Sequence, residues 1–339
     1  MEGIYSIMEA ILPQDAFRFD FMKNALLAVL LLTPLLGLLG TMAVNHQMAF
    51  CSDALGHSAL TGIGLGIILG LRNDLLAMLI FGVIWAVMIC LIKQSGSASA
   101  DTIISVFSST SIAAGLLILA RGGQFAKYSS LLIGDILAVT PPDLLYLLLA
   151  LLGTIVLWTL MYNALLMTSV DPMLARSRGI PTRLIECGFV VLVALAVMLS
   201  IRWVGVMLIN ALLILPAAAG RNLARTSRQH AVWSVGIALL SGIAGLTASY
   251  YLDTSAGATI VLVSAVCYAV SLLILPAAAG RNLARSARQH AAWSVLLALF
   301  SGLAGLTLSY YLDTSAGASI VLVSALCYAV SLAVRTVRK

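Results

Sequence analysis

Long apolar runs separated by short polar or basic stretches recur along this chain from Asn24 onward. Each run has roughly the 17 to 25 residues that an α-helix needs to cross a hydrocarbon core of about 30 Å. The runs are continuously apolar and do not alternate with polar positions, which favours helices over the strands of a barrel. The pattern predicts an all-α, polytopic bundle of transmembrane helices.

Eleven spans are expected from the pattern. They are Asn24–Val44, Ser58–Leu71, Asp74–Ile92, Thr102–Ala120, Asp143–Thr168, Leu184–Ile201, Trp203–Ala219, Ala231–Tyr251, Gly257–Leu275, Ala291–Tyr311 and Gly317–Val334. The stretch Gln124–Val139 is apolar but short and runs into Thr-Pro-Pro, so it is expected to be a re-entrant or interfacial segment and not a crossing.

A 60-residue block occurs twice in tandem, with 50 of its 60 positions identical. Leu212–Ser271 returns as Leu272–Ser331, and each copy predicts two crossings and one basic loop. Because a copy adds an even number of crossings, it leaves the tail on the same side of the membrane. The expected organisation is an N-terminal extracytoplasmic segment at 1–23, a transmembrane domain at 24–271, the duplicate at 272–331 and a basic tail at 332–339.

The differences between the copies suggest different surroundings. Gly236, Leu240 and Ile243 of the first copy are Leu296, Phe300 and Leu303 in the second, and Ala248 is Leu308. Small residues let membrane helices approach closely, whereas Leu and Phe suit contact with lipid. We therefore expect the first copy to pack within the bundle and the second to lie peripherally.

Composition excludes a water-soluble globular protein. Hydrophobic residues make up 61% of the chain and charged residues only 9%, whereas soluble domains carry about 25% charged residues. The first 23 residues contain Glu2, Glu9, Asp15 and Asp20, unlike the basic start of a secretory signal. The first apolar run is therefore expected to remain as a span.

The net charge of +6 comes from Lys and Arg residues in the short loops between spans. Placing the C-terminus in the cytoplasm puts 13 of these residues inside and six outside, in agreement with the positive-inside rule. The N-terminus is then outside. The charge is a topology signal, and no nucleic-acid partner is expected.

Five cysteines are scattered along the chain, at positions 51, 90, 187, 267 and 327. Their spacing fits neither a set of metal ligands nor a disulfide framework. We expect them to be small buried residues without disulfide bonds.

Asp53 and His57 are the strongest candidates for chemistry. Ionisable side chains at membrane depth are costly and are therefore functional candidates. Spacing i to i+4 places the carboxylate and the imidazole on one face of a helix, where they form a plausible ligand pair for Zn²⁺ or Mn²⁺. Two ligands are too few for a structural site, which suits a transit site that must release its ion.

A structural alternative stays open at this point: Asp53 caps a helix and His57 makes an ordinary hydrogen bond. The same helix would continue through Gly62, Gly66 and Gly70. Glycines at four-residue intervals form two overlapping GxxxG motifs, which predict close packing against another helix.

The segment Ser169–Pro181 predicts a short capped helix in a basic loop. Asp171 can cap a helix whose first residue is Pro172, and Gly179 ends it. Such a helix could be a handle for a partner protein or an ordinary solvated loop, and the residues by themselves favour neither.

The remaining polar residues are expected to be structural. Asp101 and Asp135 are expected to cap helices, Asp253 and Asp313 to occupy turns, and His230 and His290 to lie at the membrane interface. The sequence contains no GxxxxGK[ST], HExxH or GxSxG motif. The chain is therefore not expected to be an enzyme or to bind ATP itself.

Four motifs resemble one known family. They are Met48–Gly66, Leu132–Leu144, Asp171–Pro181 and Val204–Arg221. In order and spacing these segments are similar to the permease subunit of bacterial ABC importers for zinc, manganese or iron, from about Asn24 to Ser271. The stretch Gly-Asp-Ile-Leu-Ala-Val-Thr-Pro, which begins at Gly134, is most similar to members of the zinc-uptake type.

The resemblance implies a homodimeric permease in the bacterial inner membrane. It would receive metal from an extracytoplasmic metal-binding protein and be driven by a separate ATP-binding subunit, with no cofactor of its own. Asp53 and His57 match family positions associated with the metal path. The positions that match the coupling helix, which docks on the ATPase, are Asp171, Pro172, Leu174, Arg176, Arg178 and Gly179.

The second copy of the repeat departs from the family pattern, because nine crossings become eleven. The expected function is import of a divalent transition metal, with zinc preferred and manganese or iron as alternatives. A transport-inactive scaffold or receptor disabled by the duplication is a further alternative. An ion-driven secondary transporter is the last alternative.

Overall fold

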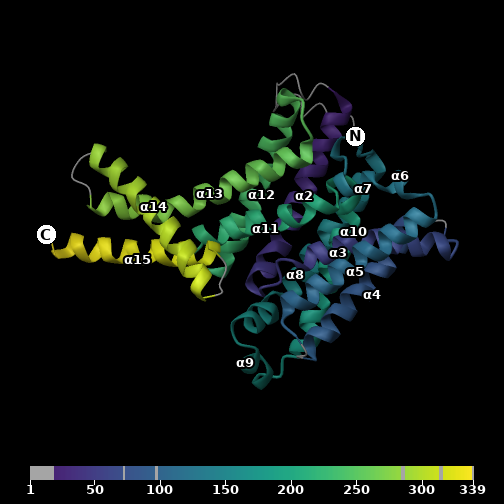
Figure 1. Ribbon diagram of the computed structural model, residues 1–339, viewed down its shortest axis with the longest axis horizontal. Helices are drawn as coiled ribbons and strands as arrows, with labels where there is room; N and C mark the ends of the chain where they lie inside the picture. Colours follow the sequence, from purple (N-terminus) through teal and green to yellow (C-terminus); the bar gives the residue numbers. More distant parts are fainter. Residues whose placement is uncertain (1–18, 72, 96–97, 284–286, 313–315, 338–339) are drawn as a thin grey trace. The chain divides into compact units, whose positions relative to one another are not determined.

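The computed structural model describes residues 19–71, 73–95, 98–283, 287–312 and 316–337. Within these residues the regular structure is entirely helical (Figure 1). The helices are α2 (Asp20–Asn45), α3 (Cys51–Ile68), α4 (Asp74–Gln94), α5 (Ala100–Arg121), α6 (Phe125–Tyr128), α7 (Ser130–Ile133), η2 (Ile136–Ala138), α8 (Pro141–Val170), α9 (Pro172–Ser177), α10 (Thr182–Val204), α11 (Val206–Leu223), α12 (Ser227–Leu252), α13 (Ala256–Leu283), α14 (Ala287–Leu312) and α15 (Ala316–Val337). The predicted all-α fold class is confirmed.

Eight helices in the described part of the chain are long and apolar enough to cross a membrane: α2, α4, α5, α8, α10, α11, α12 and α14. They correspond to eight of the eleven expected spans. The other three expected spans fall on α3, on the shorter apolar stretch Ala256–Leu272 and on α15. As expected, Gln124–Val139 is not a crossing, because it is divided into α6, α7 and η2.

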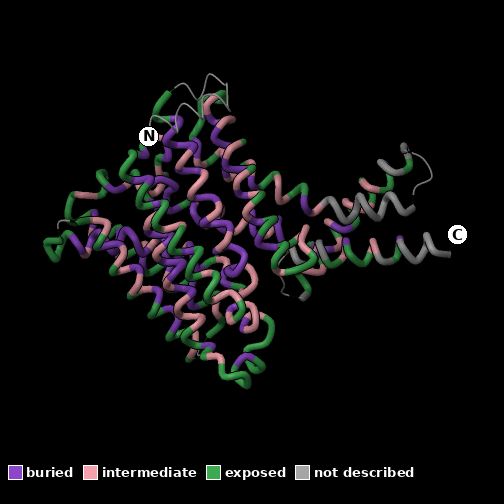
Figure 2. Tube along the Cα trace, turned by 180° about the vertical axis from the view of Figure 1, so that it is seen from behind, coloured by how far each residue is buried: buried purple, intermediate pink, exposed green. Residues whose placement is uncertain are grey.

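The chain divides into two compact units, one ending at Ala265 and the other beginning at Val266. In the first unit α2 is buried along most of its length, since apolar residues occupy all of its sides and it packs against α8, α11 and α12. Buried residues run through the first unit (Figure 2), whereas only six of the 30 residues of α8 are buried. In a membrane protein such exposed apolar faces are the surface that meets lipid.

Polar residues set the start of several helices. The side chains of Asn73, Ser99 and Thr226 accept hydrogen bonds from backbone N–H groups in the first turns of α4, α5 and α12. These bonds satisfy groups that the helix itself leaves without partners. Ser99, and not Asp101, caps α5, so the expectation for Asp101 is wrong.

The short helices are held at α10 and α4. Gly134 ends α7 with φ +72°, and Gly205 separates α10 from α11 with φ +88°. Each glycine lies so close to the backbone at the other that a Cβ on either would collide with it. At the other end of the segment, the Tyr128 hydroxyl donates a hydrogen bond of 2.8 Å to Asp74 at the start of α4.

The boundary between the two repeat copies lies inside one helix. α13 continues for 28 residues from Ala256 to Leu283, beyond the expected end at Leu275. The reason is that the repeat begins within α11, so the joint connects the helical end of one copy to a helical segment of the next. In the second unit, α14 and α15 pack together with Gly305 against Ile320, as Gly245 packs against Ile260 in the first.

The packing of α12 corrects one sequence argument. α12 contacts α2 through Ser234, Ala238 and Gly242, and the Ser234 hydroxyl donates a 2.8 Å hydrogen bond to the Gly37 carbonyl. Gly236 and Leu240 are instead exposed, and a Cβ at Gly236 would meet no atom within 4 Å. α12 does pack within the bundle, but not through the small residue that suggested it; the peripheral position of the second copy stays a prediction.

None of the ten positions at which the copies differ is buried in the first copy. The positions are Thr226, Ser227, Val232, Gly236, Ile237, Leu240, Ile243, Ala248, Thr259 and Val266. The residues with which α12 contacts α2 are unchanged in the second copy, as Ser294, Ala298 and Gly302. The second copy therefore retains the packing surface of the first.

Candidate functional site

Asp53 and His57 lie in the first two turns of α3 and face each other. His57 Nε2 is 3.5 Å from Asp53 Oδ1, and their side chains are 16% and 35% exposed. The predicted sharing of one helix face is confirmed. The capping alternative for Asp53 is wrong, because the N-cap of α3 is Phe50 and no side chain caps this helix.

Neighbouring helices hold α3 through its glycines. A Cβ at Gly62 would lie 3.2 Å from the Ala77 carbonyl of α4, and one at Gly115 of α5 would lie 2.9 Å from the Thr61 backbone nitrogen. Thr61 Oγ1 also donates a 2.6 Å hydrogen bond to the Ser111 carbonyl. This close packing on α4 and α5 confirms the role expected of the GxxxG pattern, except that Gly70 ends the helix with a positive φ of 72°.

The contact between α3 and α5 brings a third side chain to the pair. The Ser108 hydroxyl of α5 donates a hydrogen bond of 3.3 Å to Asp53 Oδ2, the oxygen that does not face His57. Ser108 therefore helps to orient the carboxylate. Sequence reasoning missed Ser108, because serines are common in membrane helices and its contact with Asp53 spans 55 residues.

On the other side, α3 meets α11. The Ser52 hydroxyl donates a 2.6 Å hydrogen bond to Asn210 Oδ1, and Gly56 packs against Val206 and Ile209. Asn210 was also missed by sequence reasoning. Its signal was available: it is a single amide in an otherwise apolar helical segment.

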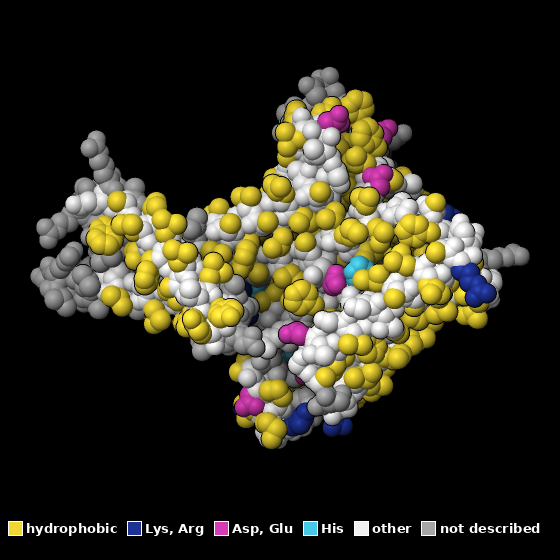
Figure 3. Space-filling view, in the orientation of Figure 1, with side chains coloured by type: hydrophobic (Ala, Val, Ile, Leu, Met, Phe, Trp, Pro, Cys, Tyr) yellow, Lys and Arg dark blue, Asp and Glu magenta, His cyan; other side chains and the backbone are white. Residues whose placement is uncertain are grey.

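The donor set of one chain is small. His57 Nδ1 is buried and makes no hydrogen bond in the described part of the chain. No group of three or more His, Cys, Asp or Glu side chains suited to a metal lies among the described residues. Asp53 offers carboxylate oxygens and His57 offers a ring nitrogen. One chain therefore supplies two ligand side chains, fewer than the four ligands of a closed zinc site. Figure 3 shows how sparse such groups are: one histidine lies beside an acidic side chain amid apolar and backbone surface.

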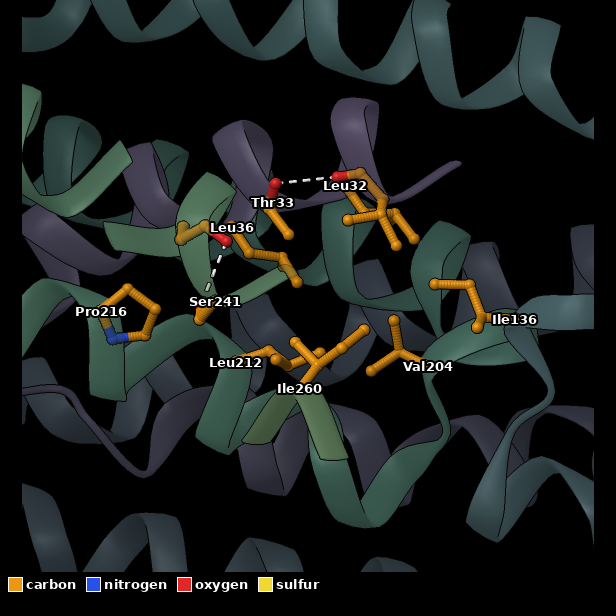
Figure 4. A pocket seen from close by; sticks show the side chains of 11 residues that line it. Leu32, Thr33, Leu36, Ile136, Val204, Leu212, Pro216, Ser241 and Ile260 are labelled. Atoms are coloured by element: carbon orange, nitrogen blue, oxygen red, sulfur yellow. Dashed lines mark hydrogen bonds between the residues drawn. The ribbon is translucent and has the colours of Figure 1, made fainter. Parts of the chain in front are cut away.

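A small cavity lies elsewhere in the first unit, lined by residues of α2, η2, α10, α11, α12 and the start of α13. Figure 4 shows its apolar lining, with Thr33 and Ser241 as the polar members. Both hydroxyls are bonded to backbone carbonyls, of Val29 at 2.8 Å and of Ala238 at 3.1 Å. Since it presents no metal ligand, this cavity is not part of the candidate path.

The segment from Asp171 forms the predicted capped helix, α9. Asp171 Oδ1 accepts hydrogen bonds from the backbone nitrogens of Met173 and Leu174, and Pro172 occupies the first turn. Gly179 follows with φ +77°. Met173 and Leu174 are 72% and 47% exposed, so the short helix presents apolar side chains outward. Arg176 Nε donates a 3.1 Å hydrogen bond to Thr182 Oγ1, which ties α9 to the start of α10.

One expectation about the cysteines is wrong. Cys90 of α4 and Cys187 of α10 form a disulfide bond. The two residues are 97 positions apart, so only the packing of α4 on α10 brings them together. Cys51 is free and buried, as expected. Cys267 and Cys327 are also free, but they are only partly buried, so their expected burial is wrong.

Charged groups surround the same ends of α4 and α10. Lys93 Nζ lies 3.7 Å from Glu186 Oε2. His46, in the loop after α2, contacts the Leu165 carbonyl through Nε2 at 3.1 Å. Burial lowers the pKa of His46, although the nearby Glu186 carboxylate opposes this shift. The imidazole is therefore neutral at neutral pH.

Other expected residues have structural roles. Asp135 caps η2 through a 3.0 Å hydrogen bond from the Leu137 nitrogen, as predicted. Asp253 ends α12 in the left-handed region with φ +52°, as expected of a turn residue. His230 is buried, and its Nε2 lies 2.9 Å from the Ala217 carbonyl; its position at the depth of the membrane interface stays a prediction. Asp313 lies outside the described residues, and the surroundings of His290 are not among those described.

Known proteins with similar sequences transport metals. Residues 18–273 match the ABC 3 transport family, and residues 266–335 match it a second time. The chain is 34% identical over 258 residues to the high-affinity zinc uptake system membrane protein ZnuB of Haemophilus influenzae, covering 75% of this chain and 97% of that protein. It is 30% identical over 259 residues to the manganese import system permease protein ScaB of Streptococcus parasanguinis, covering 76% and 92%.

A solved structure has the same fold over most of its length. PsaBC from Streptococcus pneumoniae, in complex with a Fab, superposes with a TM-score of 0.68 at 27% identity. The match covers 81% of this chain and 96% of that chain. The segment beyond the first match, from residue 274, is covered by the second match to the same family.

Proposed function

The chain belongs to the ABC 3 transport family and is a multi-pass permease of an ABC-type metal importer, and we propose that the metal it carries inward is zinc. The similarity to ZnuB supports zinc, and the relatives named for manganese make that ion the alternative. The observation that carries the proposal is the Asp53 and His57 pair on one face of α3. A carboxylate and an imidazole are donors that zinc accepts readily.

The proposed path is completed by a second copy of the chain. One chain supplies two side chains, so a homodimer with two such pairs facing each other would supply four, the usual coordination number of zinc. The partial exposure of both side chains supports this arrangement, since neither is sealed inside its own bundle. A site shared between chains can open when the chains move apart, which a transit site requires.

The proposed energy source is a separate ATP-binding subunit that docks on α9. Its exposed Met173 and Leu174 give an apolar contact, and the hydrogen bond from Arg176 to Thr182 transmits displacement to α10. An extracytoplasmic metal-binding protein would deliver the ion on the opposite face. This arrangement places the permease in the plasma membrane with its N-terminus outside and its C-terminus in the cytoplasm.

Radiometal uptake tests the proposal. The chain is expressed in a bacterial strain that lacks its own zinc and manganese importers, with and without a candidate ATP-binding subunit. We expect uptake of ⁶⁵Zn²⁺ that requires the ATP-binding subunit. Excess unlabelled Mn²⁺ should compete only weakly with this uptake. Stronger competition by Mn²⁺ than by Zn²⁺ would assign the manganese alternative, and uptake without the ATP-binding subunit would indicate a secondary transporter. Absence of any uptake would leave the scaffold alternative.

A further inference from the structure

The disulfide bond between Cys90 and Cys187 joins two helices at the same end. Cys90 lies near the end of α4, and Cys187 lies near the beginning of α10. Cys90 is 1% exposed, whereas Cys187 is partly exposed. Cys187 is therefore the more accessible residue of the pair. Neither cysteine takes part in the proposed metal path.

Other interactions hold the same two helix ends together. Gln94 Nε2 donates a 3.2 Å hydrogen bond to the Arg183 carbonyl and lies 3.2 Å from the sulfurs of Cys90 and Cys187. Lys93 and Glu186 form an ion pair beside it. Because these contacts do not depend on the S–S bond, they keep the two thiols close together after reduction. The pair is therefore arranged to form its bond reversibly.

The expected orientation of the chain places this end of α4 and α10 on the cytoplasmic side. The cytoplasm keeps thiols reduced, so a disulfide bond there is generally transient and responds to oxidants. The polar groups around the pair place it near the membrane surface, within reach of small water-soluble oxidants. A permanent structural bond would suit the opposite side of the membrane.

The pair also lies between the two functional parts of the chain. Four residues separate the end of α9 from the start of α10, and Arg176 of α9 donates a hydrogen bond to Thr182 at that start. α4 packs closely on α3, with Gly62 of α3 against Ala77 of α4. Asp53 and His57 also lie on α3. A covalent link between α10 and α4 therefore restricts how far a displacement of α9 can move α10 relative to the helix that supports the metal pair.

We propose that Cys90 and Cys187 form a thiol–disulfide switch that stops metal transport when the cytoplasm becomes oxidising. This inference rests on the proposed function and on the expected orientation. With both thiols reduced, α10 moves relative to α4 and transport proceeds. With the disulfide formed, the ends of the two helices move as one body and the coupling from α9 is lost.

Hydrogen peroxide is the oxidant class that the switch would meet. The thiolate of Cys187, the more exposed residue, attacks one peroxide oxygen, so that the O–O bond breaks, hydroxide leaves and a sulfenic acid forms. The Cys90 thiolate then attacks this sulfur, the S–O bond breaks and a second hydroxide leaves as the disulfide forms. The two hydroxides take up the protons that the two thiols lost on ionising. In total, two thiols and one peroxide give one disulfide and two waters. A dithiol reductant reverses the change.

The test combines thiol trapping with uptake in cells that express the full chain and its ATP-binding subunit. Cells are treated with hydrogen peroxide, then with dithiothreitol, and free thiols are trapped with a maleimide reagent at each stage. The variants are Cys90→Ser and Cys187→Ser. The matched control replaces the other three cysteines, Cys51, Cys267 and Cys327, with Ala and keeps the pair.

We expect the pair to be reduced in untreated cells and oxidised after peroxide. Uptake of ⁶⁵Zn²⁺ should then fall about tenfold, within the usual range of coupling between separate sites, and recover with dithiothreitol. The control should behave like the original chain, and both serine variants should keep their uptake. If peroxide lowers uptake in the serine variants as much as in the original chain, the inference is overturned. Full uptake in untreated cells whose pair is already a disulfide would overturn it as well.

Failure of the proposed function gives a different result. In that case no variant takes up metal even before peroxide is added. Thiol trapping then decides the inference by itself, because it does not depend on transport. A pair that stays in one oxidation state through both treatments overturns the switch.

Discussion

At the scale of single residues, the chain holds two ionisable side chains on a helix that packs inside an apolar bundle. Their cost is reduced because each partly satisfies the other: Asp53 Oδ1 faces His57 Nε2, and Ser108 donates to the second carboxylate oxygen. The buried and unbonded Nδ1 of His57 is the remaining unsatisfied atom. Buried polar groups without partners are rare and require an explanation. A passing cation that reorders the pair is consistent with this arrangement.

Removing either donor should stop transport. Asp53→Ala and His57→Ala are each expected to reduce uptake of ⁶⁵Zn²⁺ to background, because the remaining donor cannot hold the ion alone. The amount of each variant in the membrane should be unchanged, as measured by immunoblotting of isolated membranes. Asp101→Ala, on the exposed start of α5, is the matched control and should transport normally. Normal uptake by both site variants would remove the proposed path.

Ser108 should have a smaller effect of a different kind. A hydrogen bond that orients a carboxylate contributes about 1 kcal/mol, so Ser108→Ala is expected to raise the zinc concentration for half-maximal uptake about fivefold, with little change in the maximal rate. Ser109→Ala, at the exposed neighbouring position, is the control. An unchanged half-maximal concentration in Ser108→Ala would show that the 3.3 Å contact has no role in transport.

At the scale of helices, α3 is positioned by close contacts with its neighbours. Its glycines and that of α5 leave little room for side chains at the crossings with α4 and α5. Such contacts bring backbones near each other and replace the hydrophobic effect as the source of association within a membrane. The positions of Asp53 and His57 therefore depend on glycines that have no functional side chain.

Two glycine variants separate packing from helix propensity. Gly115→Ala should lower the stability of the protein in detergent by about 1 to 3 kcal/mol, because its Cβ would collide with the backbone of Thr61. Gly153→Ala has the same chemistry but meets no atom within 4 Å, and it should be neutral or stabilising by up to about 1 kcal/mol. Thermal unfolding of the purified variants measures both. Equal stability of the two would contradict the packing argument.

At the scale of the whole molecule, the tandem repeat extends the chain by a second compact unit. Each copy supplies a helical hairpin whose expected ends lie on the same side of the membrane, so the added copy does not invert the chain. Neither copy contains a counterpart of Asp53, His57 or Asn210. The duplication therefore adds no second copy of the proposed metal-binding pair.

Either copy should be sufficient. Deleting Leu272–Ser331 or deleting Leu212–Ser271 leaves one copy joined correctly to α11, and both shortened chains should take up ⁶⁵Zn²⁺. The reason is that all ten differences fall at positions that are not buried in the first copy. Uptake by only the chain that keeps the first copy would show that the second cannot replace it.

A glycine in the contact surface provides the control for these deletions. Gly302 of the second copy corresponds to Gly242, where a Cβ would lie 2.6 Å from Val29 and 2.7 Å from Thr33. Gly302→Leu should therefore abolish uptake in the chain that lacks Leu212–Ser271. In the full chain the same change should be harmless, because Gly242 remains in place.

The sequence by itself determined the helical class, eight of the expected spans, the non-crossing segment before α8, the capped helix α9 and the shared face of Asp53 and His57. All of these depend on patterns within about 30 neighbouring residues, such as apolar run length, capping residues and i to i+4 spacing. Only the tertiary structure decided that Ser108 and Asn210 join the site, that Cys90 is bonded to Cys187, and that Ser234 and Gly242, not Gly236, face α2. These contacts connect residues 55 to 213 positions apart. Such pairings depend on which helices pack together, and an apolar helix with small residues on several sides does not specify its partner through its own sequence pattern.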